Sequence, residues 1–305
     1  MAEQSPNWVE LPPDVTAAIL SRLGAAEVLE SAQKVCTTWR RICQDPAMWR
    51  TVDMCNLGHF STSNNYEAMT MHAVDRSSGQ LAAISVGFFC TDALLAYISD
   101  RSSQLRLLRL VCCDDISDIG WMEAVKKLPL LEELHLYYTS ISKEAIGVVG
   151  RCCPLLKSLK LNNQGSRRPY IDCDDEALAI AENMPGLHHL QLFGNKITKD
   201  GLQAILDNCP HLESLDLRQC FNVNFGGNLG KRCSQQIKNV RRPYDSTEDY
   251  EFDTDILDYE SFDEDHPTSF SDIDFMSEDD EHYVFSGGSN VSYDEDYAEY
   301  CLMIS

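Results

Sequence analysis

The feature that most constrains this chain is a leucine pattern that recurs through its middle. The pattern reads Leu-x-x-Leu-x-Leu-x-x-(Cys or Asn), and three of its copies are complete. Two copies keep the leucines but end differently, and a weaker copy opens the series. In chain order the first positions are Leu81, Leu105, Leu131, Leu156, Leu187 and Leu212. Their intervals are 24, 26, 25, 31 and 25 residues, so the chain should fold as a stack of similar units.

Each repeated unit joins a short apolar strand to an amphipathic segment. Within a strand the leucines fall on one face, because successive side chains alternate. Between strands, residues 141–150, 175–183 and 197–208 carry apolar side chains at helical spacing. Neither apolar face is covered until a neighbouring unit stacks on it. The pattern therefore predicts an α/β solenoid over residues 51–240, with a parallel sheet on its concave side, helices outside and a cap at each end.

A second ordered pattern precedes the repeats, over residues 8–50. A proline pair and Asp14 give a helix-start signal, and apolar residues then recur at helical spacing. The later elements are Val35-Cys36-x-x-Trp39-Arg40 and Asp45-Pro46-x-x-Trp49. Three amphipathic helices in about forty residues cannot bury all their apolar surface against one another. The surplus predicts a partner protein, and the alternative is a helical cap on the repeats.

These elements resemble the F-box, the helical module that docks a protein onto the Skp adaptor of a cullin-based ubiquitin ligase. The repeats resemble leucine-rich repeats, and both together are similar to the plant F-box proteins with cysteine-containing leucine-rich repeats. Gly24 departs from the F-box pattern, in which a proline usually follows the leucine. The resemblance implies a three-helix F-box over residues 8–50. Its implied adaptor-binding residues are Leu11, Pro12, Ile19, Leu20, Leu23, Val35, Trp39 and Trp49, of which the last three complete the interface or brace it.

The alternation within the strands also predicts a recognition face for a protein substrate. Residues between and just after the leucines should project from the concave sheet. A first column contains Arg109, His135, Lys160, Gln191 and Asp216. A second column contains Val111, Tyr137, Asn162, Phe193 and Arg218. Aromatic and arginine side chains are typical of interaction hot spots, whereas the alternative is an ordinary solvated sheet.

The longest interval between repeats adds about six residues to one unit. The segment from 165 to 170 accounts for them, and insertions in solenoids often extend a binding surface. We therefore expect Arg167, Arg168 and Tyr170 to form a lip beside the concave face, with a plain surface loop as the alternative.

No pattern of catalytic or metal-binding residues stands out in the sequence. The thirteen cysteines are scattered without a Cys-x-x-Cys pair, which is typical of small buried apolar residues in a reducing compartment. The histidines have neither metal-ligand nor nucleophile spacing, and no apolar run approaches the ~20 residues of a membrane span. We expect a non-catalytic protein that uses no cofactor or metal, binds neither nucleic acid nor membrane, and resides in the nucleus or cytoplasm.

Acidic residues are concentrated at the C-terminal end. Residues 245–305 contain 21 Asp and Glu and no Lys or Arg, so they carry nearly all of the net charge of −23. Aromatic residues alternate with the acids without helical or strand period, which predicts a disordered tail over residues 241–305 that is able to bind. Since the concave columns are basic, one hypothesis is that the tail occupies them weakly until a better ligand displaces it. The alternative is a tail that never touches the solenoid.

Two functions from different classes remain open. In the first, the chain is the substrate-recognition subunit of an SCF-type (Skp–cullin–F-box) E3 ubiquitin ligase. The F-box then holds the Skp adaptor, and the repeats hold an unknown protein for ubiquitination and degradation. In the second, the chain resembles acidic-tailed leucine-rich-repeat proteins of the nucleus, which bind basic partners such as histones. Binding of the Skp adaptor to residues 1–55 separates the two, because only the first requires it.

Overall fold

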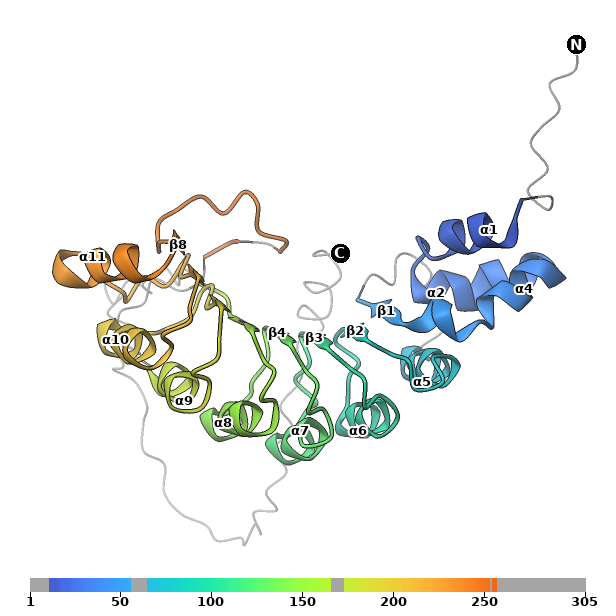
Figure 1. Ribbon diagram of the computed structural model, residues 1–305, viewed down its shortest axis with the longest axis horizontal. Helices are drawn as coiled ribbons and strands as arrows, with labels where there is room; N and C mark the ends of the chain where they lie inside the picture. The colour runs from blue at the N-terminus through green and yellow to red at the C-terminus, as the bar shows by residue number, and fades with distance from the viewer. Residues whose placement is uncertain (1–10, 56–64, 166–172, 253, 257–305) are drawn as a thin grey trace, which may run out of the picture.

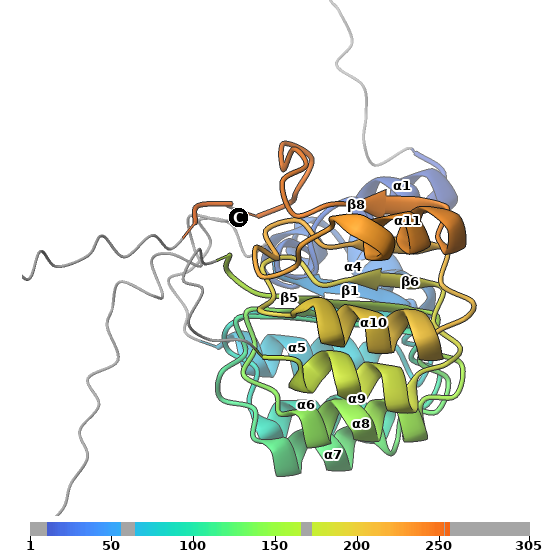
Figure 2. The same cartoon turned by 90° about the vertical axis from the view of Figure 1, so that its left-hand side faces the viewer.

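The computed structural model describes residues 11–55, 65–165, 173–252 and 254–256. A group of short helices lies at one end of a curved solenoid (Figure 1). The solenoid has a parallel sheet on its inner side and a row of helices on its outer side (Figures 1 and 2). This is the α/β architecture that the repeats predict.

The N-terminal helical module forms the three predicted helical segments. Its elements are α1 (Pro13–Leu20), α2 (Ala25–Glu27), η2 (Val28–Ala32), α3 (Gln33–Val35), α4 (Thr37–Cys43) and η3 (Pro46–Trp49). The elements α2, η2 and α3 are continuous, so the second segment is one helical stretch with a π turn at its centre. The Cys36 thiol caps α4 by accepting from the Trp39 N–H. The Asp45 carboxylate caps η3 by accepting from the Ala47 N–H.

Within the described residues, eight parallel strands pair in chain order. They are β1 (Thr51–Met54), β2 (Ala83–Val86), β3 (Leu107–Val111), β4 (Glu133–Tyr137), β5 (Ser158–Asn162), β6 (His189–Gln191), β7 (Ser214–Asp216) and β8 (Asn239–Arg241). The outer helices are α5 (Tyr66–Arg76), α6 (Asp92–Arg101), α7 (Asp118–Val125), α8 (Lys143–Cys152), α9 (Asp175–Asn183), α10 (Lys199–Asn208) and α11 (Gly227–Gln236). Helices α5 and α11 are the first and last of these outer helices and lie at the two ends of the solenoid, where the sequence predicts caps.

The leucines of the repeat form the core between the sheet and the outer helices. The central leucines of successive strands are register partners, and each has no more than 2% of its surface exposed. They are Leu108, Leu134, Leu159, Leu190 and Leu215. Because alternate residues point to opposite faces, this register directs the residues between the leucines to the concave side.

Side chains near the helix N-termini tie each unit to the next. Hydroxyl groups cap four outer helices by accepting backbone N–H groups. These caps are Thr91, Ser117, Ser142 and Thr198. Three of the cap residues also donate their own N–H to a carboxylate of the preceding unit, namely Asp92, Asp118 or Asp174. The repeating bonds hold neighbouring helices side by side.

The N-terminal helical module is joined directly to the first turn of the solenoid. The Trp49 indole N–H donates to the Cys43 carbonyl at 2.8 Å. From α5, the Arg76 guanidinium donates to the same carbonyl at 3.3 Å and to the Gln33 side chain at 2.7 Å. Strand β1 begins two residues after Trp49. Since these contacts cross between the two parts, the helices have a defined position at the end of the sheet.

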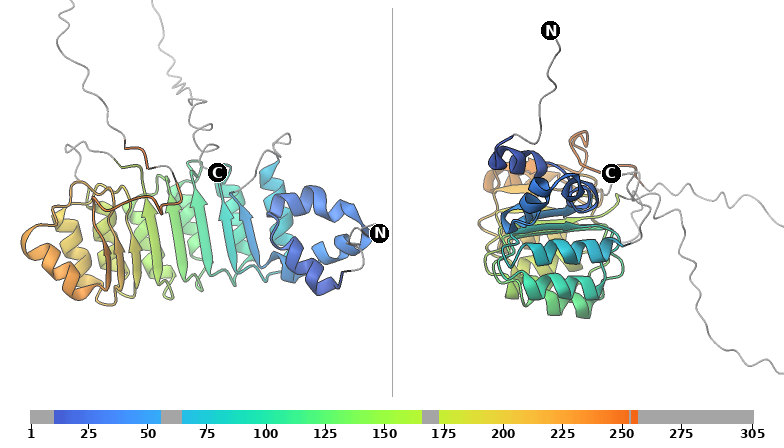
Figure 3. Two further views of the ribbon diagram at one scale, coloured as in Figure 1. Left: turned by 90° about the horizontal axis from the view of Figure 1, so that it is seen from above. Right: turned by 90° about the vertical axis from the view of Figure 1, so that its right-hand side faces the viewer.

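The end of the described chain differs from the sequence expectation. Residues 241–305 are expected to form a disordered tail, whereas Arg241 ends β8 and residues 242–252 and 254–256 run on across the concave side (Figure 3). We call residues 242–252 and 254–256 the C-terminal strap. The solenoid supplies the contacts that order it. Residues 257–305 of the predicted tail lie outside the described residues.

Candidate functional site

The predicted adaptor-binding residues lie on the N-terminal helical module, and part of the set is exposed. Val35 and Ile19 expose 62% and 37% of their surfaces, and Pro12 is also exposed. Val15 exposes 41% on the same helix as Ile19, although the sequence-derived set omits it. The half-buried members are Leu11, Leu23 and Trp39. Three large apolar side chains left open on so small a module are available for contact with a partner protein.

Two members of that set do not reach the surface. Leu20 has 0% and Trp49 2% of its surface exposed. Helix α1 turns Leu20 inward, and the Trp49 indole is bonded within the chain to Cys43. In this conformation neither side chain protrudes from the module, and both brace it from inside. The burial differs from the expectation for Leu20 and agrees with the bracing alternative for Trp49.

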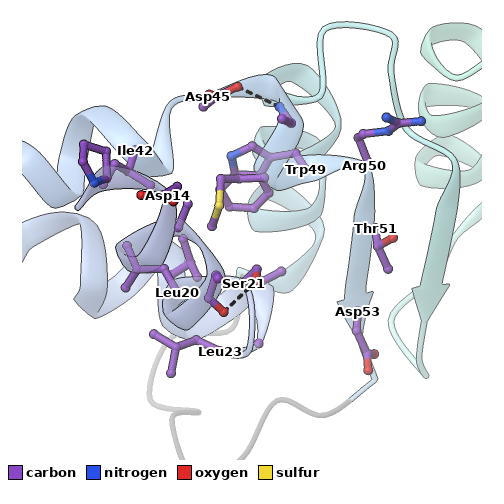
Figure 4. Close-up of a pocket in the computed structure, with 18 residues that line it drawn as sticks. Asp14, Leu20, Ser21, Leu23, Ile42, Asp45, Trp49, Arg50, Thr51 and Asp53 are labelled. Carbon is purple, nitrogen blue, oxygen red and sulfur yellow. Dashed lines mark hydrogen bonds between the residues drawn. The ribbon is translucent and has the colours of Figure 1, made fainter. Parts of the chain in front are cut away.

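A pocket of about 720 Å³ lies between α1 and the start of β1, and its lining does not include Val15, Ile19 or Val35. Figure 4 shows Leu20, Leu23 and Trp49 on its helical side, with Thr51 and Asp53 of β1 opposite. The module therefore combines protruding apolar side chains with a partly apolar recess, which suits a protein partner with apolar side chains of its own.

On the concave side, the strand register brings the two predicted columns together. Arg109 pairs with His135 and Lys160 with Gln191, and the intervening pairs continue the first column to Asp216. In the second column, the register partners are Val111, Tyr137 and Asn162, followed by Phe193 just after β6 and Arg218 just after β7. The alternation of the strands thus predicted the composition of this face.

The columns are nevertheless not an open surface, because the C-terminal strap covers them. Tyr137 is 0%, Phe193 1% and Arg218 2% exposed. The Tyr250 ring lies parallel to the Phe193 ring, with centroids 3.8 Å apart. The Phe252 ring packs on the Tyr137 ring at 4.7 Å.

Acidic residues of the strap pair with the basic residues of the face. Asp249 lies 2.6 Å from Arg218 and 2.6 Å from Arg241, measured between carboxylate oxygens and guanidinium nitrogens. Glu251 lies 2.9 Å from Arg109, and it accepts the Tyr137 hydroxyl. Its carboxylate is 3.9 Å from the Lys160 ammonium. The arrangement places an alternating acidic and aromatic segment on a basic and aromatic surface.

Burial and charge shift the pKa values of groups on this face. Hydrogen bonds from Arg241, and then from Arg218, lower the pKa of Asp249 to about 2 despite some desolvation. Burial, with the nearby charges of Lys160 and Arg109, lowers the pKa of His135 to about 3. His135 is therefore neutral at physiological pH, whereas Asp249 is ionised.

Arg218 differs from the other basic residues because it is held by the solenoid itself. Its guanidinium meets the Asp216 carboxylate through Nε and Nη2, with distances of 2.8–3.1 Å. Gln191 also donates to Asp216, at 3.0 Å. This internal pair fixes Arg218 so that its Nη1 atom points at Asp249 of the strap.

The functional residues that the sequence set omits are those of the strap, from Asp249 to Phe252. Their signal was visible as the repeated acid–aromatic pair Asp249-Tyr250-Glu251-Phe252. The same composition recurs through the tail, so the sequence did not indicate which part would bind. The predicted lip residues Arg167, Arg168 and Tyr170 lie outside the described residues.

The described part of the chain holds no group of three or more His, Cys, Asp or Glu side chains able to bind a metal ion. No cysteine of the described residues forms a disulfide, and burial raises the pKa of Cys153 to about 12 and that of Cys209 to about 11. Among the described helices, none is both long and apolar enough to cross a bilayer.

Comparison with known proteins identifies the family. Residues 8–55 match the F-box-like family model. The chain is 54% identical to F-box protein SKIP19 of Arabidopsis thaliana, over 97% of this chain and 94% of that protein. It is 47% identical to the putative F-box/LRR-repeat protein 21 of Arabidopsis thaliana, over 81% of this chain and 84% of that protein. Among solved structures it is similar to the yeast Rad7 and Elc1 complex, with 11% identity, a TM-score of 0.37 and coverage of 75% of this chain and 81% of that chain. On its identity to these relatives, the chain belongs to the F-box/leucine-rich-repeat proteins of plants.

Proposed function

We propose that this protein is the substrate-recognition subunit of an SCF-type E3 ubiquitin ligase. The F-box binds the Skp adaptor, and the concave face of the repeats binds a protein substrate for ubiquitination and degradation. The chain itself performs no chemistry. Its contribution to the rate is proximity, because it raises the effective concentration of substrate lysines near the ubiquitin-loaded enzyme. We propose the nucleus or cytoplasm as its location.

The observation that carries this proposal is the exposed apolar surface of the F-box. Val15, Ile19 and Val35 remain open to solvent, and a partly apolar pocket lies elsewhere on the same module. A surface of this kind gains free energy when another protein covers it, at about 25 cal/mol per Å² of apolar area. The match to the F-box-like family supports a Skp adaptor as that other protein.

A defined connection between the two surfaces supports the proposal as well. Arg76 of the solenoid bonds to Cys43 and Gln33 of the F-box, and its guanidinium lies 5.3 Å from the centroid of the Trp49 ring. A ligase subunit that acts by proximity benefits from such a connection, because a fixed geometry keeps the substrate within reach of the transferred ubiquitin.

Co-purification of the full chain with a Skp adaptor tests this function. The double variant Ile19→Ala, Val35→Ala should lose at least tenfold in adaptor affinity, because central apolar anchors each contribute about 2 kcal/mol or more. Ile119→Ala is the matched control, since Ile119 is 75% exposed on α7 of the solenoid. Equal adaptor binding by all three proteins would refute the assignment of this surface.

The alternative partner class is a basic nuclear protein bound by the acidic tail. In the described part of the chain, the acids Asp249 and Glu251 already pair with Arg218, Arg241 and Arg109. A basic partner would have to displace these internal pairs to reach them. We therefore favour the ligase subunit.

A further inference from the structure

The contacts of the strap define a binding site of specific chemistry on the concave side. We call Arg109, Tyr137, Lys160, Phe193 and Arg218 the acceptor face. Each of them contacts part of the sequence Asp249-Tyr250-Glu251-Phe252. Carboxylates meet the basic side chains, and aromatic rings meet the aromatic side chains. The face therefore selects for both properties in one extended segment.

Cation–π contacts couple the recognition of carboxylates on this face to the recognition of aromatic rings. The Arg109 guanidinium lies 5.0 Å from the centroid of the Tyr137 ring and 5.4 Å from that of Phe252. The Arg218 guanidinium lies 5.6 Å from the centroid of Phe193 and 5.9 Å from that of Tyr250. An arginine that pairs with an acid in the ligand thus also contacts the neighbouring aromatic ring of the ligand.

The attachment of the strap depends mainly on side chains. The strap adds no strand to the described sheet, whose edge is β8. Its main chain is held at a few points, where Pro243 and Thr254 carbonyls accept from Gln219 and the Ser246 carbonyl accepts from Arg218. The acidic side chains remain 54% exposed at Asp249 and 39% exposed at Glu251. Ion pairs of such exposure contribute little to binding and are screened by salt.

The strap does not satisfy every hydrogen-bond donor of the acceptor face. Glu251 meets Arg109 through Nη2, but within the described residues the buried Nε atom of Arg109 has no hydrogen-bond partner. A carboxylate that met both nitrogens would form the stronger two-bond pair. Beside the strap, a pocket of about 600 Å³ continues past Tyr250 and Glu251 along Lys160 and Gln191. The face can thus accommodate a segment that fits better or extends further.

We propose that the acceptor face binds an extended acidic–aromatic peptide of a partner protein, and that the strap occupies this site in cis until such a peptide displaces it. The partner peptide carries acids and aromatic residues in alternation, as the strap does from Asp249 to Phe252. This inference rests on the proposed function, because it names the class of substrate that the repeats recognise.

Tethering explains how a weakly held segment keeps the site occupied. Asp249 follows the end of β8 by only eight residues, and a short tether gives an effective concentration of order millimolar. A partner peptide therefore competes with a high local concentration of strap. Weakening the strap should raise the affinity for the partner without any change in the acceptor face.

The test uses the full chain and a fluorescent peptide with the sequence of residues 246–255. Fluorescence anisotropy compares the wild type with the double variant Tyr250→Ala, Phe252→Ala, which keeps the acceptor face intact. The variant should bind the peptide at least tenfold more tightly than the wild type. A peptide with both aromatic residues replaced by serine, and a lysine-rich peptide of equal length, should bind at least tenfold more weakly to that variant. Equal affinity of wild type and variant, or preference for either control peptide, would overturn the proposal.

Reversing the charges of Arg109 in the protein and Glu251 in the peptide distinguishes a lost contact from a misfolded variant. When Arg109→Glu is added to the Tyr250→Ala, Phe252→Ala variant, its affinity for the peptide should fall at least tenfold. A peptide carrying Glu251→Lys should bind this charge-reversed protein more tightly than the original peptide does. If the affinity does not recover in a folded variant, the result speaks against direct contact between the peptide and Arg109.

Adaptor binding is measured on the same proteins. Absence of peptide binding by the Tyr250→Ala, Phe252→Ala variant, with normal adaptor binding, refutes the peptide site alone, whereas a wild-type chain that fails to bind the adaptor refutes the ligase function.

Discussion

Tyr250 lies flat on Phe193, with ring centroids 3.8 Å apart and ring planes inclined by 5°. Phe193 follows β6 in the solenoid, whereas Tyr250 belongs to a segment that the sequence assigns to a disordered tail. Aromatic pairs contribute about 0.5–1.5 kcal/mol beyond the area that they bury. This pair is therefore a main attachment of the strap to the repeats.

Replacement of Tyr250 should release the strap and leave the solenoid folded. Tyr250→Ala removes the stack on Phe193, and hydrogen exchange at the Gln219 N–H, which donates to the Pro243 carbonyl, should become at least several-fold faster. Tyr244→Ala is the matched control in the same segment, because Tyr244 is 79% exposed. Hydrogen exchange followed by mass spectrometry measures both variants. The same exchange rate in Tyr250→Ala and Tyr244→Ala would contradict this role of the stack.

His135 should make the stability of the protein fall on mild acidification. Its pKa is lowered from 6.5 to about 3, so between these values the unfolded chain binds a proton that the folded chain does not. Stability therefore decreases as the pH falls through this window, by about 2 kcal/mol from this group between pH 6.5 and 5. Urea unfolding at pH 7.5 and 5 measures the change. The variant His135→Gln should lose correspondingly less stability, and an unaltered pH dependence would disprove the role of His135.

Leu20 and Ile19 are sequence neighbours whose substitution should have opposite consequences. Leu20→Ala removes a fully buried side chain and should cost about 2–5 kcal/mol of unfolding free energy. Ile19→Ala changes an exposed side chain, so it should leave stability within about 0.5 kcal/mol and weaken adaptor binding instead. Denaturation and adaptor titration on both variants distinguish the two roles. A stable Leu20→Ala protein with impaired adaptor binding would return Leu20 to the interface.

Gly194 should be intolerant of any side chain. Its φ is +66°, and an added Cβ would lie 2.1 Å from the Asn163 carbonyl oxygen. Gly194→Ala is therefore expected to cost more than about 1 kcal/mol, which lowers the melting temperature by more than about 2 °C in a domain of this size. Gly186→Ala is the control, since a Cβ there would meet no described atom within 4 Å. Thermal unfolding compares them, and equal melting temperatures would show that the loop after β6 relaxes freely.

The sequence alone was sufficient for the repeating part of the structure. The period of the leucines predicted parallel strands whose central positions, such as Leu108 and Leu134, are register partners in the core. Alternation then placed Arg109 beside His135 on the concave face. These features depend on side-chain periodicity, which each unit repeats locally and stacking extends to the next unit.

Tertiary structure decided which surfaces stay open. Leu20 and Ile19 are both apolar residues of α1, but only the packing of the helical segments around Trp49 turns Leu20 inward and leaves Ile19 outside. Likewise, Tyr250 belongs to a tail of uniform acidic and aromatic composition, and only its position over Phe193 and Arg218 orders it. The physical reason is that burial and pairing arise between segments far apart in the chain, so their free energy is absent from the local pattern.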